Sequence, residues 1–186
     1  MGEGTDVIDV AQSVAGLQGT ISQVAQRVAT DLGKEVHLEC VGLSLLPAEY
    51  RRMVKDIAVQ AVRNSLVHGI ESPQFRLGAG KLAHGTIHIE VQELGGAGYK
   101  ITLEDDGQGL STDRIKQTAV QKGFITTEQA EGMDSRQVLG LLFRAGFTTV
   151  DTATKDAGRG VGMNLMADLV QQNGGKLGVA TAPGKF

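Results

Sequence analysis

The chain has 186 residues and a mass of 19.6 kDa, which fits one domain. Hydrophobic residues make up 41% and charged residues 21% of it, so the composition excludes an intrinsically disordered chain. A net charge of −3 argues against a surface that binds nucleic acid. The sequence contains no run of about 18 apolar residues, the length that a membrane-spanning helix needs. We therefore expect a cytoplasmic chain without nucleic acid as a partner.

The first third of the chain predicts a helix, a strand and a second helix. Apolar residues at steps of three and four from Thr5 to Asp31 predict one broken helix or two short ones, because Gly16 and Gly19 interrupt the pattern. Alternation of polar and apolar residues from Glu35 to Cys40 predicts a half-buried strand. A second helix is expected from Pro47 to His68.

The rest of the chain predicts a hairpin, further helices and a last strand. Residues 69–84 read as a loop with room for one helical turn, and the strands Thr86–Glu93 and Tyr99–Asp105 are joined as in a hairpin. Later elements are expected at Thr112–Lys122, Asp134–Phe143 and Val161–Asn173 as helices and at Lys176–Ala182 as a strand. This order predicts an α/β sandwich, a mixed sheet with helices on one face. Because the chain stops soon after the last strand, we expect an excised fragment that lacks its closing strand.

The second helix carries polar residues at intervals of four: Asp56, Gln60, Asn64 and His68. Its core face is expected on the other side, at Met53, Ile57, Ala61 and Leu66. Spacing alone favours a solvated polar row. Asn and His are poor helix formers, however, and their amide oxygen and imidazole nitrogen can hold Mg²⁺ or its waters. The row is therefore either a solvated surface or a ligand site.

Asp105 closes the second hairpin strand with the same parity as Ile101 and Leu103, so its carboxylate is expected on the buried face. A carboxylate there needs hydrogen-bond donors. It can cap the following turn, or it can accept a hydrogen bond from a ligand's amino group while Gly107 and Gly109 let planar rings approach the backbone. The residues alone leave both interpretations open.

Three alternating glycines at residues 158–162 stand directly before an amphipathic helix. Backbone N–H groups at a helix N-terminus attract anions, and the helix dipole adds to the attraction. The spacing is not that of a Rossmann fingerprint, and no Lys-Ser or Lys-Thr pair closes a Walker A loop.

Three features follow one another along the chain: a helix that carries Asn64, a strand that ends in AspAspGlyGlnGly, and a helix that begins at GlyArgGlyValGly. In this order they resemble the motifs of the GHKL ATPase superfamily, which includes histidine kinases and DNA gyrase B. Within it the sequence resembles the CheA-like histidine kinases. The matching stretches are ArgAsnSer-x-x-HisGlyIleGlu at 63–71, AspAspGlyGlnGlyLeu at 105–110, PheArgAlaGlyPheThrThr at 143–149 and GlyArgGlyValGlyMet at 158–163. The resemblance implies a two-layer α/β sandwich of Bergerat (GHKL ATPase) type. Residues 1–186 then form a single ATP-binding catalytic domain, with a helical segment over about 1–30 and the GHKL core over about 31–182.

The resemblance also implies site residues. Asn64 and His68 are expected to hold Mg²⁺ and phosphate oxygens, and Asp105 to accept the adenine amino group, with Gly107 and Gly109 lining the base. Other ATP-binding residues are implied at Arg114 and in a lid over residues 143–156 that contains Thr148 and Thr149. The phosphates are expected to be cradled by Gly158, Arg159, Gly160, Val161, Gly162 and Met163.

Two positions depart from the family pattern. Gln60 stands one turn before Asn64, where relatives usually carry a His or Glu thought to serve as a base. An amide can orient a nucleophile but cannot take its proton, so catalysis by Gln60, Asn64 and His68 is expected to be reduced. Val67 stands where many relatives carry an acid before His68.

The implied function is transfer of the γ-phosphoryl group of Mg·ATP to a histidine on a separate phosphoacceptor domain, and from there to a response regulator. A receptor or coupling protein is expected to act through the parent kinase. None of the chain's histidines lies in a context like the family's phosphoacceptor helix. Two alternatives remain: a nucleotide-binding pseudokinase with weak or no phosphotransfer, which Gln60 favours, and a GHKL ATPase that hydrolyses ATP, against which the HisGlyIleGlu stretch argues.

Overall fold

The computed structural model describes residues 3–147 and 163–181, with side chains from residue 13 onward. These residues belong to two compact units, which divide between Gly109 and Leu110. Each unit has its own apolar core. No helix in the described part of the chain is long and apolar enough to cross a membrane.

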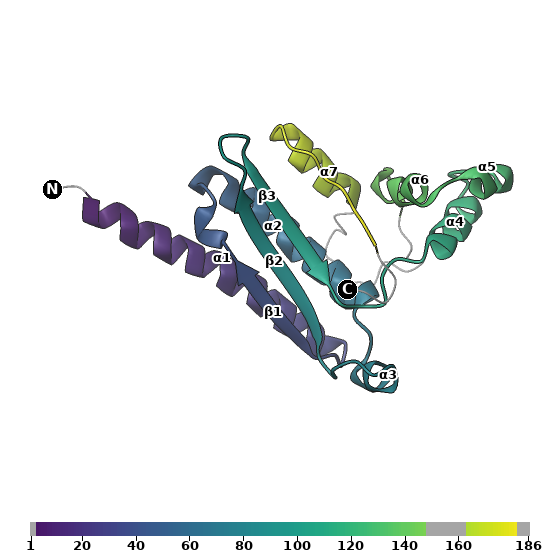
Figure 1. The fold of residues 1–186 in the computed structure, drawn as a ribbon, viewed down its shortest axis with the longest axis horizontal. Coiled ribbons are helices and arrows are strands. Elements are labelled where there is room, and N and C mark those ends of the chain that lie inside the picture. Colours follow the sequence, from purple (N-terminus) through teal and green to yellow (C-terminus); the bar gives the residue numbers. More distant parts are fainter. Residues whose placement is uncertain (1–2, 148–162, 182–186) are drawn as a thin grey trace. The chain divides into compact units, whose positions relative to one another are not determined.

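The first unit is a two-layer α/β sandwich in which two helices cover one face of a three-stranded sheet (Figure 1). Both helices contribute to a core that also contains the buried side chains of the central strand. In chain order its elements are α1 (Glu3–Asp31), β1 (Val36–Val41), a 3-10 turn (Leu43–Leu45), α2 (Ala48–Asn64), a π-helix (Ser65–Gly69), α3 (Pro73–Gly78), β2 (Gly85–Glu93) and β3 (Tyr99–Asp105).

The sheet is mixed, as predicted. β1 pairs parallel with β2, and β2 pairs antiparallel with β3. Side chains of β2 alternate, and Ile87, Ile89 and Val91 are buried on the helical face. The register sets Asp105 opposite Ile87, so the Asp105 side chain lies on that same face. The fold class predicted from the sequence is therefore confirmed.

The long first helix is continuous through its two glycines. A Cβ at Gly16 or Gly19 would meet no atom within 4 Å, so neither glycine is needed for a close contact. Each glycine costs a helix about 1 kcal/mol relative to alanine. Burial of Leu17, Ile21 and Ala25 against the sheet and α2 offsets that cost.

The expected core face of α2 was wrong by one residue. Met53, Ile57 and Ala61 are half-buried, whereas the buried row consists of Val54, Ala58 and Val62, followed by Leu66. Two adjacent apolar rows run along this helix, one residue apart. Periodicity alone does not decide which of the two faces the sheet.

The second unit is helical, with α4 (Thr112–Gln121), α5 (Thr127–Gly132), α6 (Ser135–Gly140), a 3-10 turn (Leu141–Phe143) and α7 (Met163–Gln172). Its core is formed by buried side chains of α4, α6 and the residues after α6. The short α5 was not predicted, although a capping box between Thr126 and Gln129 marks its start. The strand expected at Lys176–Ala182 is also wrong, because residues 176–181 pair with no strand in the described part of the chain.

Candidate functional site

Helix α2 leads directly into a π-helix, so the polar row ends in a widened turn. The Ile70 amide donates to the carbonyl oxygen of Ser65 at 2.7 Å, five residues back. Single π-helical turns are frequent at functional sites. Gln60 and Asn64 are half-buried on α2, and His68 is exposed within the π-helix.

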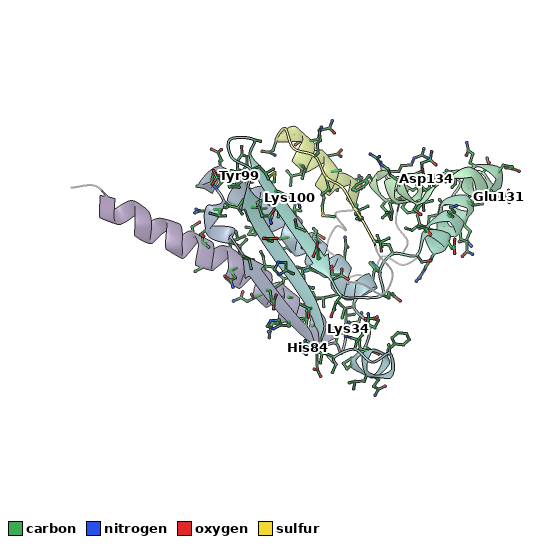
Figure 2. All side chains as sticks on the ribbon, viewed as in Figure 1. Lys34, His84, Tyr99, Lys100, Glu131 and Asp134 are labelled. Carbon is green, nitrogen blue, oxygen red and sulfur yellow. The ribbon has the colours of Figure 1, made fainter. Side chains whose placement is uncertain are left out.

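The carbonyl groups at the end of the π-helix are bound by donors from elsewhere in the first unit. Lys34, labelled in Figure 2, donates from its Nζ to the carbonyl oxygen of Leu66. Gln108 donates twice, from Nε2 to the His68 carbonyl at 2.8 Å and from its amide to the Gly69 carbonyl at 2.9 Å. Since helix ends leave carbonyls unpaired, the two bonds from Gln108 fix the segment after β3 against the end of the π-helix, at a contact that we call the junction.

Asp105 is half-buried at the end of β3 and faces this junction. Its Oδ1 accepts a hydrogen bond from the Gly107 amide at 3.1 Å. A Cβ on Gly69 would lie 2.8 Å from the same oxygen, so the carboxylate packs directly on the glycine backbone. Among the described residues, none donates to Asp105 Oδ2. The turn-capping role therefore uses one oxygen and leaves the other as an acceptor.

Gly107 is required by a contact within the chain. A Cβ at this position would lie 2.3 Å from both the carbonyl carbon and the carbonyl oxygen of Gly69. Gly109, two residues on, has a φ of 74°, which favours glycine. Close approach of ligand rings is therefore not the only reason for a glycine at residue 107.

A buried arginine binds the residue that follows Asp105. Arg76 in α3 is 1% exposed, and its Nε donates to the Leu82 carbonyl at 2.8 Å. Its Nη2 bonds Oδ2 of Asp106 at 2.7 Å, and its Nη1 bonds Oε2 of Glu71 at 2.9 Å and the Asp106 carbonyl at 3.2 Å. Asp106 Oδ1 in turn accepts from the Thr86 amide at 2.8 Å. Every guanidinium nitrogen is thus bound, as a buried charge requires.

Lys81 completes this cluster. Its Nζ lies 2.8 Å from Oε1 of Glu71, 2.9 Å from the Asp106 carbonyl oxygen and 3.1 Å from the Gly107 carbonyl oxygen. Burial by itself raises the pKa of Glu71, but the hydrogen bonds from Lys81, the Glu71 backbone and Arg76, together with the Lys81 charge, outweigh it and lower that pKa. We call Glu71, Arg76, Lys81 and Asp106 the charged cluster.

Glu71 is expected to make the fold sensitive to acid. Because its pKa in the folded chain lies below its ordinary value of 4.5, its stabilisation is fully present above that value and is lost as the pH falls through the folded pKa. Urea unfolding followed by circular dichroism, at pH values from about 7 to about 3, measures this. The free energy of unfolding should fall more steeply with acid in the wild type than in Glu71→Gln, which cannot titrate. Equal pH dependence in both proteins contradicts the assignment.

The remaining predicted residues belong to the second unit or fall outside the described residues. Arg114 is exposed on α4, where its amide bonds Ser111 Oγ at 3.2 Å, and Met163 begins α7 and packs on the core of the second unit. These two belong to the second unit, whereas the polar row of α2 and Asp105 belong to the first. The predicted residues outside the described ranges are Thr148, Thr149, Gly158, Arg159, Gly160, Val161 and Gly162.

Comparison with known proteins identifies the family. The model of the family described as histidine kinase-, DNA gyrase B- and HSP90-like ATPase matches residues 53–186, which contain α2, Asp105 and the glycine segment. The chain belongs to this ATPase family. The resemblance to CheA-like histidine kinases is likewise confirmed.

The relatives include both motility and chemotaxis proteins. The chain is 39% identical over 132 residues to the gliding motility regulatory protein of Myxococcus xanthus, covering 71% of this chain and 17% of that protein. It is 32% identical over 164 residues to chemotaxis protein CheA of Bacillus subtilis and 36% identical over 163 residues to that of Salmonella typhimurium, covering 88% and 87% of this chain and 24% of each relative. The chain thus spans about a quarter or less of the length of these relatives.

The polar row of this ATPase domain fits a magnesium ion that arrives with nucleotide. Mg²⁺ prefers oxygen ligands and usually keeps several waters, taking one or two protein groups plus substrate phosphates. The Asn64 amide oxygen suits that role directly, whereas the imidazole nitrogen of His68 suits contact through a water. Across residues 3–147 and 163–181, no three His, Cys, Asp or Glu side chains converge as a metal cage.

Sequence reasoning missed the charged cluster of the ATPase domain. Glu71 and Asp106 stand inside matched stretches but received no role, and Arg76 and Lys81 were placed in a loop. The available signal was two cations and an acid within residues 69–84 beside a strand end that carries two aspartates. Nothing in the sequence pairs Arg76 with Asp106, which lies thirty residues away.

Proposed function

We propose that this chain is the Mg·ATP-binding catalytic domain of a CheA-like two-component histidine kinase. It transfers the γ-phosphoryl group of ATP to a histidine on a separate phosphoacceptor domain. Both compact units belong to that one domain in this proposal, and the family match supports this because residues 53–186 include parts of each unit.

The observation that carries the proposal is the geometry of Asp105. One carboxylate oxygen is held by the Gly107 amide, and the other accepts no hydrogen bond within the described residues. The carboxylate lies against Gly69, on the helical face of the sheet, at the end of the polar row of α2. A fixed acceptor beside bare backbone suits the amino group at the edge of a planar base.

The reaction needs positioning and charge neutralisation more than covalent chemistry by the protein. An unprotonated imidazole nitrogen of the acceptor bonds to the γ-phosphorus, and the bond from phosphorus to the bridging oxygen breaks, so that ADP leaves with the electron pair. Magnesium, when bound, offsets the charge of the phosphates. In this proposal Asn64 and His68 orient the phosphate oxygens, and the Gln60 amide oxygen holds the proton on the second imidazole nitrogen.

The partners follow from that reaction. The acceptor histidine lies on a phosphoacceptor domain, and a response regulator receives the phosphoryl group from it. A receptor or coupling protein controls the parent kinase, and the whole assembly works in the cytoplasm. The relatives that carry the names of chemotaxis and gliding motility proteins support this setting.

A second candidate is a pseudokinase that binds nucleotide and signals through its conformation. Gln60 favours it, because this residue occupies the place of a base and cannot accept a proton. A transfer assay with the cognate phosphoacceptor domain separates the two functions. A pseudokinase binds ATP but does not label the acceptor domain. A GHKL ATPase releases inorganic phosphate even when the acceptor domain is absent.

Asp105→Asn is expected to weaken ATP binding by about 1.5–3 kcal/mol, because the adenine amino group loses a charged acceptor. Isothermal titration calorimetry with ATP, ADP and GTP, with and without Mg²⁺, measures this. Adenine nucleotides should bind more tightly than GTP, since guanine presents an oxygen where adenine presents its amino group.

Glu104→Gln is the matched control for Asp105→Asn. Glu104 neighbours Asp105 on β3, its side chain is exposed, and the substitution removes the same charge. Its ATP affinity should equal that of the wild type. Equal affinities for ATP and GTP in the wild type contradict the Asp105 assignment.

A further inference from the structure

Lys81 binds two consecutive backbone carbonyl groups next to the proposed adenine acceptor. Its Nζ contacts the carbonyl oxygens of Asp106 and Gly107 at 2.9 and 3.1 Å. The third contact of the ammonium is Oε1 of Glu71 at 2.8 Å, and the Glu71 side chain is only 8% exposed. The lysine is therefore anchored by a buried counter-charge while it holds the backbone.

Each of those carbonyls shares a planar peptide group with an amide that faces the junction. In a trans peptide the C=O and N–H point in opposite directions, so fixing one fixes the other. The group that binds Lys81 through the Asp106 carbonyl donates its Gly107 N–H to Asp105 Oδ1 at 3.1 Å. The group bound through the Gly107 carbonyl donates its Gln108 N–H to the Gly69 carbonyl at 2.9 Å.

One of these amides acts on Asp105 directly, and the other acts on it through Gly69. The Gly107 amide occupies one carboxylate oxygen and so sets the rotation of the carboxylate. The Gln108 amide fixes the segment on Gly69, whose backbone packs against that same carboxylate. Arg76 supports the first peptide group through a longer contact of 3.2 Å to the Asp106 carbonyl, but among the described side chains only that of Lys81 binds both carbonyls.

We infer that Lys81 is a positioning residue for nucleotide recognition: by holding the carbonyls of Asp106 and Gly107, it orients the two peptide groups that aim Asp105 at adenine. The inference rests on the proposed function, because it takes Asp105 as the adenine acceptor. Lys81 is thereby added to the residues proposed to act in nucleotide binding, although it lies outside the polar row and the glycine segment. It binds the two peptide groups on the side opposite to Asp105.

The test compares two nucleotides that differ only at the proposed contact. ATP and purine riboside triphosphate, which lacks the adenine amino group, are titrated into wild-type chain, Lys81→Met and Lys81→Gln. Wild type should prefer ATP by about tenfold or more, as for a hydrogen bond to a charged group. In Lys81→Met that preference should fall about 5–10-fold. A lysine that only stabilises the fold would leave the preference unchanged in the folded fraction.

Controls separate this effect from others. Lys100→Met removes an exposed lysine from β3, at the hairpin end of the sheet (Figure 2), and should keep the wild-type preference. Combining Lys81→Met with Asp105→Asn should lower the preference no further than Asp105→Asn alone, because both act on one contact. Additive losses overturn the inference.

The other outcomes distinguish a failure of the inference from a failure of the proposed function. A wild-type preference retained in Lys81→Met overturns the inference and leaves the proposed function intact. If Lys81→Met does not fold, Lys81→Gln, which keeps a hydrogen-bond donor, is judged by the same preference. A wild type without preference for ATP overturns both the adenine contact and the inference. Normal preference without transfer to the phosphoacceptor domain overturns only the kinase proposal.

Discussion

Arg76→Met is expected to lower the free energy of unfolding by about 3–5 kcal/mol, the usual cost of removing one partner from a buried ion pair. The guanidinium is 1% exposed and bonds both Glu71 and Asp106. Methionine fills part of the volume but leaves the Asp106 carboxylate without its cation and the Leu82 carbonyl without its donor. Since a domain is stable by only about 5–15 kcal/mol, this loss is large. Urea unfolding near neutral pH, followed by circular dichroism, measures it.

Arg52→Met provides the matched control. Arg52 is exposed on α2, so the same substitution there removes a charge without opening a buried pair. Its cost should stay within about 0.5 kcal/mol. A loss below about 1 kcal/mol for Arg76→Met would show that the charged cluster contributes little net stability, as some buried ion pairs do.

Where polar and apolar residues alternate strictly, the bounds of the strands were predicted to within one residue. β3 spans Tyr99–Asp105 as expected, and β2 begins at Gly85, one residue before the predicted start. Alternation identifies the buried face of a strand directly, so the side of the sheet on which Asp105 lies was predictable. On α2 two apolar rows run side by side, and the choice between them depends on packing that the sequence does not contain.

The parts of the site that were missed depend on contacts between distant residues. Spacing and family resemblance made Asn64 and His68 candidates. The π-helix that contains His68 was not predicted, because no local sequence signal indicates a hydrogen bond from Ile70 to a carbonyl five residues back. A buried arginine in a charged loop looks like a solvated one until Asp106 is placed beside it. Residues 176–181 contain alternating apolar side chains, yet a strand also needs a partner edge, which they do not have within the described residues.

Gln60→His and Gln60→Glu are expected to raise the rate of phosphoryl transfer by up to about 10²-fold, the lower range of general-base assistance. Gln60 is half-buried one turn before Asn64, and none of its side-chain atoms is hydrogen-bonded to a described residue. Its amide oxygen can hold the proton of an attacking imidazole but cannot remove it. Nucleotide affinity should change little, because Asp105 lies on a different element.

Single-turnover transfer to the cognate phosphoacceptor domain, measured beside ATP affinity for each variant, tests this expectation. Gln18→Glu on α1 is the control, since it adds the same charge at an exposed position on another helix. A gain in both Gln60 variants but not in Gln18→Glu ties the effect to a base at that position and not to added charge. A fast wild type with no gain in either variant means that proton removal does not limit the reaction. His68, which follows Asn64 in the polar row and carries an imidazole, is then the residue to replace next.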